Sequence, residues 1–378
     1  MAYRLITDSS GLKKASNHIR AQSRIALDCE AAGFHRYTDR LCLVQLSTSE
    51  ATFLFDPLAA DPADTLRPAL EDSQVQVVMH GADFDLKLLH RDLGIRLRGL
   101  FDTQVAATLL GASSIGLAAL LQERLGVSLS KEHQRADWAK RPLADELLRY
   151  AASDTEHLLA LANVLDRELT EKGRRDWAAE EFRALESIEW VEDQADPVTR
   201  VKGARYLEPR PLTTLRALLA WRDRIARKRD RAPFRVIGDQ ALLAVAAESP
   251  STVEALAAIQ GVSPRLAKAH GEALLRELAR IGKLAEADLE PYPRGNRDGQ
   301  GRLSPEDEQL VENIRALRER RADELELDKG ILLSNAQIQE IVRAYPRSMG
   351  ALLSLPSVKG WQAGILGSEI LKILEKRG

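Results

Sequence analysis

Cysteine is scarce in this sequence, which has only Cys29 and Cys42 among 378 residues. Two cysteines cannot form a disulfide framework for a chain of this length, and this favours a reducing compartment. Long apolar runs are lacking as well. No segment approaches the roughly 20 apolar residues of a membrane-spanning helix, and the N-terminus lacks the apolar core of a signal peptide. We therefore expect a soluble, cytoplasmic protein with no membrane partner, and nothing indicates an obligate protein partner.

An overall excess of charge is also missing, because the formal net charge is −2. A balanced total can conceal opposed local fields, so the charge has to be examined by segment. Residues 221–235 contain seven basic side chains against two acidic ones. This segment predicts a surface that follows phosphates, with Arg222, Arg224 and Lys228 as candidate substrate-binding residues. An ordinary solvated helix face is the alternative.

Short apolar runs indicate strands in the first 80 residues, and helical patterns follow them. The second and third runs are too close for a parallel crossover and must form a hairpin. No strand is expected after about Ala178, so the pattern predicts a mixed sheet with helices and then an all-helical remainder. The predicted strands are Arg24–Cys29, Leu41–Leu46, Thr52–Phe55 and Val75–Met79, and the predicted helices are Ala63–Glu71, Asp83–Leu93, Thr103–Leu110, Leu117–Leu125 and Ala144–Leu169.

The helical remainder contains a repeat with a constant offset of 96 residues. The offset matches apolar positions. It also matches a proline and a glycine, since it carries Pro250 to Pro346 and Gly271 to Gly367. Between the copies lies a stretch rich in Pro, Gly and Asn, which is typical of a linker. We predict an α/β domain over 1–205, a first helical module over 206–288, a linker over 289–302 and a second module over 303–378.

Four carboxylates and one tyrosine carry the chemistry that we expect. Asp28 and Glu30 are two apart in a predicted strand, so both project from one face. Asp85 falls in the first turn of a helix, where a carboxylate can also serve merely to complement the helix dipole. Tyr150 and Asp154 share a helix face at i and i+4. Leu147, Leu158 and Leu161 extend this predicted face as an apolar stripe, in which a carboxylate persists only if it is paired or bound to metal. An ion pair with Arg141 or Arg149 is the alternative.

Clustered carboxylates suit hard divalent cations such as Mg²⁺ or Mn²⁺, and the chain has no Cys/His cluster of a zinc site. Several unprotonated carboxylates tolerate such proximity only if a cation offsets their repulsion. Two divalent ions can hold the attacking and leaving oxygens of a phosphoryl displacement. The acidic residues, together with the basic segment, predict a phosphodiesterase that acts on nucleic acid.

Three segments resemble the motifs of the four-acid 3′–5′ exonuclease superfamily, in its tyrosine subclass: LDCE (27–30), HGADFDLKLL (80–89) and YAASD (150–154). Three more narrow the resemblance to the ribonuclease D family: LCLVQLS (41–47), GLFDTQVAA (99–107) and KEHQRADWAKRPL (131–143). The segment LRALLAWRDRIARKRDRAP (215–233) resembles the start of a helicase-and-ribonuclease-D C-terminal (HRDC) domain. The second copy in the repeat then resembles a more divergent HRDC domain, with Leu317 in place of Trp221.

The resemblance implies a ribonuclease H-like exonuclease domain followed by two small all-α HRDC-type domains. It also implies two divalent ions, one held by Asp28, Glu30 and Asp154 and the other by Asp28 with support from Asp85. Tyr150 would position the attacking water, and Lys131 is placed to approach the terminal nucleotide, although it could be an ordinary surface lysine.

The function expected from this resemblance is 3′–5′ exoribonuclease activity. The enzyme would release nucleoside 5′-monophosphates from RNA with a free 3′ end, in tRNA 3′ processing and stable RNA maturation.

Two alternatives stay open. A DNA 3′–5′ exonuclease would use the same acids, because discrimination depends on contacts to the 2′-hydroxyl. A non-catalytic RNA-binding scaffold would use the acids in core ion pairs.

Overall fold

The computed structural model describes residues 3–130, 132–293 and 303–376 and divides into two compact units. The sheet unit comprises the described residues of 1–30, 41–190 and 302–378. The helical unit comprises residues 31–40 and the described residues of 191–301. Each unit is considered by itself. Across the described ranges, no helix combines the length and the apolar character that crossing a membrane requires.

A six-stranded sheet forms the centre of the sheet unit, in the order β1-β4-β3-β2-β5-β6. All four predicted strands are present, and β1 and β6 are two short edge strands that the apolar patterns did not predict. Their few residues give too little periodicity to recognise. The strands are β1 (Tyr3–Ile6), β2 (Arg24–Ala31), β3 (Leu41–Ser47), β4 (Thr52–Phe55), β5 (Gln76–Met79) and β6 (Leu100–Asp102).

The predicted hairpin is confirmed, because β3 and β4 pair antiparallel with Val44 opposite Phe55 and Ser47 opposite Thr52. The pairs β1–β4, β2–β5 and β5–β6 are parallel. Strand β2 therefore lies in the interior of a mixed sheet, and its residues Ile25, Ala26 and Leu27 have no exposed surface. The sequence of a strand that is covered on both faces is typically a continuous apolar run, and the start of β2 has such a sequence.

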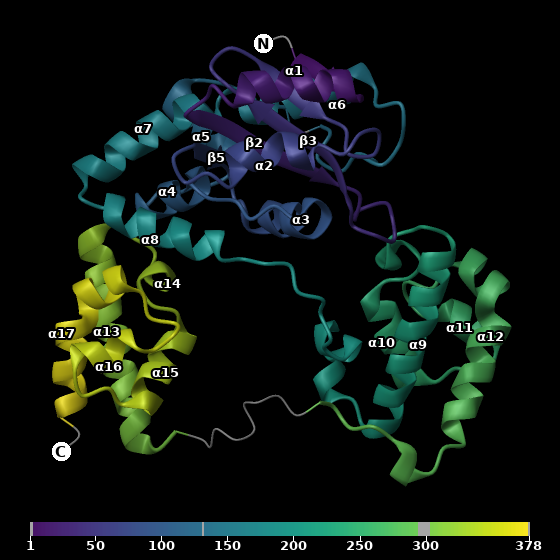
Figure 1. The fold of residues 1–378 in the computed structure, drawn as a ribbon. Helices are drawn as coiled ribbons and strands as arrows, with labels where there is room; N and C mark the ends of the chain where they lie inside the picture. The colour runs from purple at the N-terminus through teal and green to yellow at the C-terminus, as the bar shows by residue number, and fades with distance from the viewer. Residues whose placement is uncertain (1–2, 131, 294–302, 377–378) are drawn as a thin grey trace. The chain divides into compact units, whose positions relative to one another are not determined.

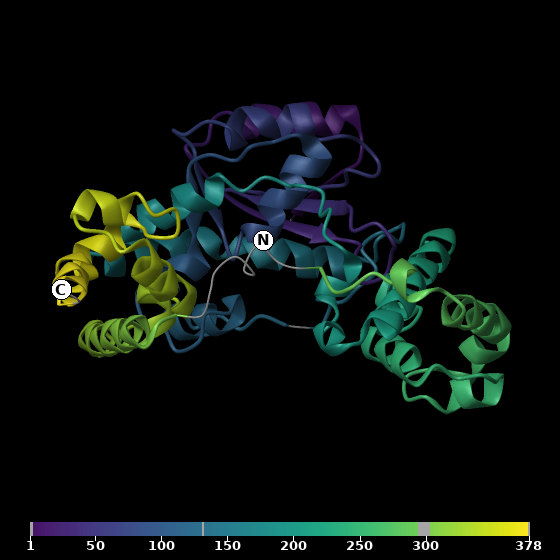
Figure 2. The same ribbon diagram turned by 90° about the horizontal axis from the view of Figure 1, so that it is seen from below.

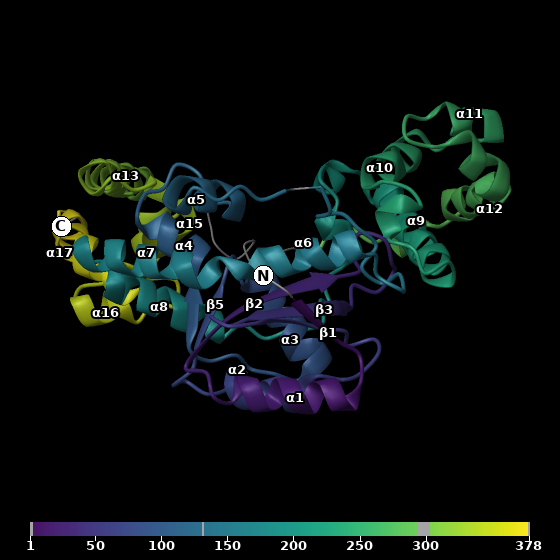
Figure 3. The same cartoon turned by 90° about the horizontal axis from the view of Figure 1, so that it is seen from above.

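Helices cover both faces of the sheet. Figure 3 shows α1, α2 and α3 on one face, and α6 and α7 on the other. The boundaries of α3 and α5 agree with the predicted ones, and those of α2 and α4 differ by one residue. These helices are α1 (Ser9–Ile19), α2 (Ala63–Leu70), α3 (Asp83–Leu93), α4 (Thr103–Leu109), α5 (Leu117–Leu125), α6 (Asp145–Glu156), α7 (Leu158–Glu171) and α8 (Arg175–Glu186).

The single helix predicted over Ala144–Leu169 is wrong, because the chain breaks into α6 and α7 at His157 (φ −106°, ψ −2°). The predicted apolar stripe is consequently not one helix face. Helix α6 instead buries Leu148, Ala151, Ala152 and Thr155. The regular spacing of leucines continues on both sides of the break, so the sequence pattern does not indicate that the helix ends there.

The repeat is confirmed as two copies of one helical arrangement (Figures 1 and 2). The offset of 96 residues carries the first residues of α10, α11 and α12 onto those of α15, α16 and α17. The first module contains α9 (Pro209–Lys228), α10 (Asp239–Glu248), α11 (Val253–Ala258) and α12 (Pro264–Gly282). The second contains α13 (Pro305–Leu325), α14 (Lys329–Leu332), α15 (Asn335–Ala344), α16 (Met349–Leu353) and α17 (Gly360–Glu375).

A buried arginine performs the same structural task in both modules. Arg222 donates to the Ile237 carbonyl at 3.2 Å and to Asp239 at 2.6 Å. Arg318, its counterpart in the repeat, donates to the Leu333 carbonyl at 3.0 Å and to the Asn335 side chain at 2.9 Å. Each guanidinium therefore links the first long helix of its module to the segment that starts the next one.

Glycine recurs in the last helix of each module for a steric reason. A Cβ on Gly271 would lie 3.2 Å from the Val253 side chain, and one on Gly367 would lie 2.7 Å from Met349. Val253 and Met349 are themselves related by the repeat. At both positions the last helix lies against the same neighbouring helix, and an added side chain would require the Val253 or Met349 side chain to move.

The module boundaries differ from the predicted ones. Val198, Val201 and Ala204 precede the boundary at 206 but lie in the core of the first module. Leu289 is buried and Tyr292 packs against the same core, although both fall in the predicted linker. Residues 294–302 of that linker lie outside the described residues.

The second module is joined to the α/β domain within the sheet unit. Glu180 of α8 accepts from the backbone nitrogens of Gly360 and Trp361 at 2.7 and 2.9 Å. Glu181 accepts from the indole nitrogen of Trp361 at 2.8 Å, and the Trp361 ring stacks on Trp177 with centroids 5.1 Å apart. Glu180 therefore satisfies donors that the first turn of α17 leaves free, and the negative charge suits that end of the helix dipole.

We predict that Trp361→Ala releases the second module from α8. The indole is 6% exposed, and its loss should lower the free energy of unfolding by about 3 kcal/mol. Thermal unfolding and limited proteolysis between the α/β domain and the second module will measure this. Trp190→Ala is the control, because Trp190 is 39% exposed and should change stability little. Equal stability of the two variants would contradict this account of the joint.

Candidate active site

Strand β2 supplies the first two acidic side chains of the site. Asp28 and Glu30 follow the fully buried Ile25–Leu27 run and are partly exposed at the end of the strand. Their separation of two residues directs both carboxylates to the same face of the sheet. The buried part of the strand thus fixes the backbone from which they project.

Helix α6 brings Tyr150 and Asp154 to the same place. The carboxylates of Asp28, Glu30 and Asp154 offer ligand atoms that all lie within 4.8 Å of one another. Tyr150 donates a hydrogen bond from its hydroxyl to Asp154. Behind it, the Tyr150 ring contacts His133 and Trp138, with centroids 5.7 and 6.2 Å away. The predicted convergence of strand and helix is therefore observed for these residues.

Asp85 lies close to this trio but is not one of its three members. It occupies the first turn of α3 and is 8% exposed. The turn before α3 is held by Asp102, which accepts from the backbone nitrogens of Gly81 and Ala82 at 3.0 and 2.8 Å. Asp102 also caps α4, so one buried carboxylate orders both helix starts beside Asp85.

Burial and mutual repulsion disfavour the charged forms of these acids. Burial raises the pKa of Asp28 to about 6, and burial together with the charge of Asp28 raises the pKa of Asp154 to about 8. The pKa values of Glu30 and Asp85 are raised well above their usual range, first by burial and then by neighbouring acids, chiefly Asp28. Burial and the charge of Asp154 also raise the pKa of the Tyr150 hydroxyl, which stays protonated at neutral pH.

Such a group of acids fits divalent cations. The donors are all oxygens, as Mg²⁺ and Mn²⁺ prefer, and a cation would remove the repulsion that raises their pKa values. The alternative partner Arg141 is engaged elsewhere, since it donates to Asp56 at 2.6 and 2.7 Å. Arg149 is exposed to solvent. Arg141 therefore serves Asp56, and the acids of the site gather oxygen ligands that suit a cation.

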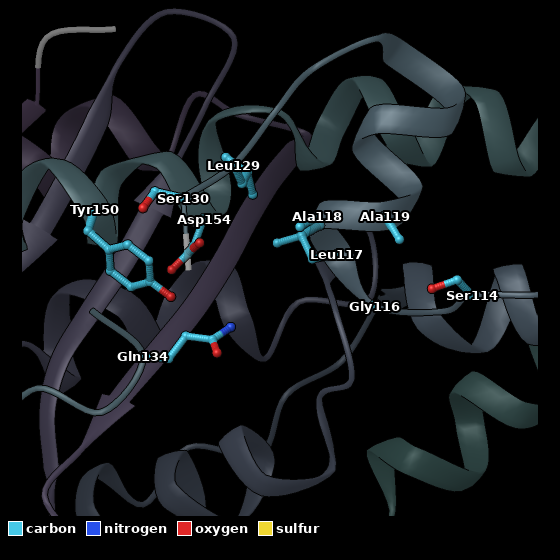
Figure 4. A pocket seen from close by; sticks show the side chains of 10 residues that line it. All are labelled: Ser114, Gly116, Leu117, Ala118, Ala119, Leu129, Ser130, Gln134, Tyr150 and Asp154. Atoms are coloured by element: carbon cyan, nitrogen blue, oxygen red, sulfur yellow. The ribbon is translucent and has the colours of Figure 1, made fainter. Parts of the chain in front are cut away.

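A pocket of about 270 Å³ opens beside the acids (Figure 4). In the figure, the side chains of Tyr150, Asp154 and Gln134 face one region, with Leu117 and Ser114 on the far side. Gln134 was not among the predicted site residues, although it lies in the segment 131–143 that carried the family resemblance. Lys131 lies outside the described residues, while its neighbour Ser130 lines the pocket.

The predicted basic residues of the first module differ in their surroundings. Arg224 and Lys228 are exposed on α9 and available to a ligand. The Arg222 side chain is only 14% exposed, and its hydrogen bonds lie within the module. The structure gives Arg222 an internal supporting role that charge counting could not distinguish from a surface one. Substrate binding by any of the three stays a prediction.

Comparison with known proteins places these features in a class. A family model described as 3′-5′ exonuclease matches residues 3–170, and the HRDC domain model matches 212–278 and 307–374. The fold is thus that of a 3′–5′ exonuclease domain followed by two HRDC domains.

Relatives that match along nearly the whole chain identify the particular family. The chain is 31% identical over 373 residues to a ribonuclease D of Pseudomonas paraeruginosa, covering 98% of this chain and 97% of the relative. It is 30% identical to a ribonuclease D of Xanthomonas oryzae pv. oryzae over 93% of each chain. The crystal structure of Escherichia coli RNase D, an exoribonuclease involved in structured RNA processing, is 27% identical with a TM-score of 0.72 over 100% of this chain and 99% of that chain. This chain belongs to the ribonuclease D family.

We predict that divalent ions stabilise the protein more strongly as the pH rises from about 6 to about 8. Without metal, folding raises the pKa of Asp28 and Asp154, so the folded state retains protons that the unfolded state has released. These two acids therefore make the metal-free fold less stable as the pH rises through their folded pKa values. A cation requires the deprotonated acids, and its effect grows over the same range.

The measurement is the thermal midpoint with chelator and with Mn²⁺ at several pH values. Asp28→Asn is the matched variant, because it removes one ionisable ligand and keeps the side-chain shape. An undiminished Mn²⁺ effect in that variant would show that the cation stabilises the protein elsewhere.

Proposed function

We propose that this chain is a 3′–5′ exoribonuclease that removes nucleoside 5′-monophosphates from RNA with a free 3′ end, using two divalent ions. The observation that carries the proposal is the convergence of the Asp28, Glu30 and Asp154 carboxylates within 4.8 Å. Membership of the ribonuclease D family supports RNA as the substrate. By the same reasoning we propose tRNA precursors and other stable RNAs as natural substrates and the cytoplasm as the place of action.

The site residues have separate tasks in this proposal. Asp28, Glu30 and Asp154 would hold one Mg²⁺ or Mn²⁺, and Asp28 with Asp85 would hold the other. When bound, the ions would supply Lewis acidity for the phosphate and lower the pKa of a water molecule. Tyr150 would orient that water through its hydroxyl, which stays protonated and donates to Asp154.

Recognition of the 3′ end is assigned to the pocket beside Tyr150. Its 270 Å³ and its polar lining from Ser130 and Gln134 suit a terminal nucleotide. Lys131, which lies between these two residues in the sequence, is proposed to approach the terminal nucleotide. The exposed Arg224 and Lys228 are proposed to follow the RNA backbone, which carries no sequence information.

Asp28→Asn and Asp154→Asn should each abolish nucleotide release while leaving RNA binding largely intact. Each removes a charge that a cation needs and preserves the side-chain volume. Release of nucleoside monophosphates from a 3′-labelled RNA, with Mg²⁺ or Mn²⁺, is the measurement. Asp83→Asn is the control, because Asp83 pairs with Lys87 on the exposed side of α3 and should keep activity. Retained hydrolysis in Asp28→Asn would argue against the site. Absence of hydrolysis in wild type would favour the scaffold alternative.

Tyr150→Phe should lower kcat by about 100-fold, with a smaller effect on KM and on thermal stability. The hydroxyl is lost, but the ring contacts with His133 and Trp138 remain. Steady-state kinetics on a short single-stranded RNA will measure this. A change confined to KM would mean that Tyr150 binds substrate in the ground state and does not orient the attacking water.

A DNA 3′–5′ exonuclease is the second candidate, because the acids do not contact the sugar. Parallel assays on single-stranded RNA and DNA of one sequence separate the two. Faster release from DNA would overturn the choice of RNA and leave the metal site unaffected.

A further inference from the structure

An aromatic pair lies exposed on the helical unit. Phe34 is 37% exposed and Phe234 is 51% exposed, and their ring centroids are 5.5 Å apart. The guanidinium of Arg235 lies over the Phe34 ring at 4.7 Å. We call these three residues the aromatic platform. The two rings are tilted by 53° to each other, and with a cation over one of them they present a partly apolar surface at the exterior.

The platform is built from segments that are distant in sequence. Phe34 belongs to residues 31–40, and Phe234 and Arg235 belong to the short 3₁₀ helix η3 (Pro233–Arg235) of the first module. A backbone hydrogen bond from Ala232 to the His35 carbonyl, at 3.2 Å, joins these segments beside the rings. The rings are therefore held in place by contacts other than their own.

Tyr37 provides a second anchor for the loop. Its hydroxyl donates to Asp223 at 2.8 Å and accepts from Arg227 at 2.9 Å. Arg36 forms a further ion pair with Asp230 at 3.5 Å. These partners lie on α9 or directly after it, so the residues that follow Phe34 are fixed to the first module. Such support reduces the ordering that a ligand would have to impose.

Positive charge surrounds the platform. Residues 31–40 contribute two arginines against one aspartate, and residues 221–235 contribute seven basic side chains against two acidic ones. Arg40, Lys228, Arg229 and Arg231 are exposed. A phosphate backbone is the complement of this charge, while the rings offer stacking to a base of any sequence.

We propose that the aromatic platform binds unpaired bases of the RNA substrate by stacking, so that the enzyme holds single-stranded RNA. This inference rests on the proposed function for the identity of the ligand. It assigns to Phe234 and Phe34 a contact with bases, whereas the basic side chains around them contact phosphates and discriminate little between paired and unpaired RNA.

The test uses the full chain and a hairpin RNA with a 3′ tail of about ten nucleotides. A second hairpin carries abasic sites through the tail and keeps every phosphate. Binding is measured with chelator present, so that no trimming occurs. Wild type should bind the base-bearing tail more tightly. Phe234→Ala should weaken that binding about tenfold and leave binding of the abasic tail unchanged, as expected for the loss of one stacked base. Phe234→Trp should restore the affinity.

Two control variants separate stacking from support of the loop. Tyr37→Phe loses the hydrogen bonds to Asp223 and Arg227 but removes no platform ring, and Tyr206→Ala removes a 73% exposed aromatic elsewhere in the same unit. Both should retain the difference between the two tails. Quenching of 2-aminopurine in the tail by wild type, but not by Phe234→Ala, provides an independent signal of stacking.

The proposal is overturned if Phe234→Ala weakens both tails equally, since the ring would then act only through the loop or the charges. It is also overturned if wild type binds the two tails with equal affinity. The platform would then be a binding surface for a protein. Hydrolysis of a dinucleotide with Mn²⁺ is followed in parallel. Absence of that hydrolysis in wild type refutes the proposed nuclease activity and leaves the binding result to be interpreted on its own.

Discussion

Electrostatic repulsion among the acids at the end of β2 is the constraint on which the catalytic part of the molecule depends. Asp28, Glu30 and Asp154 would separate in water, yet the buried strand and α6 hold them within 4.8 Å. This repulsion, together with burial, raises their pKa values, and a divalent cation would relieve it. Elements around the site resist relaxation: β2 lies between β3 and β5, and Arg141 ties the segment after Trp138 to Asp56 and to the Cys42 carbonyl.

The two helical modules share a fold but have different surroundings. The second module has its α17 N-terminus occupied by Glu180 and its Trp361 stacked on Trp177. The corresponding end of α12 in the first module is capped by its own Ser263. The second module thus supports the α/β domain. The first module contains the basic α9 and holds Phe234 against Phe34. Duplication preserved the internal contacts, such as those of Arg222 and Arg318, and left the outer surfaces free to diverge.

Much of the fold could be predicted because its signals are local. Apolar runs located β2 to β5, the short connection required the β3–β4 hairpin, and a constant offset identified the repeat. Of the candidate site, the i and i+2 spacing of Asp28 and Glu30 and the i and i+4 spacing of Tyr150 and Asp154 fixed which side chains share a face. The same reasoning failed at His157, where the apolar pattern continues although the helix breaks. It also failed for Arg222, because the sequence does not show how far a side chain is exposed.

The sequence by itself determined the strand and helix types, the duplicated module and the residues able to bind cations, because each depends on neighbours within a few positions or on a constant repeat. Only the tertiary structure decided that α6 brings Asp154 to Asp28, that Arg141 is engaged by Asp56, and that residues 31–40 pack against the first module. These outcomes depend on contacts between segments from about 85 to nearly 200 residues apart. Such contacts arise from packing and loop closure and leave no periodic trace in either partner alone.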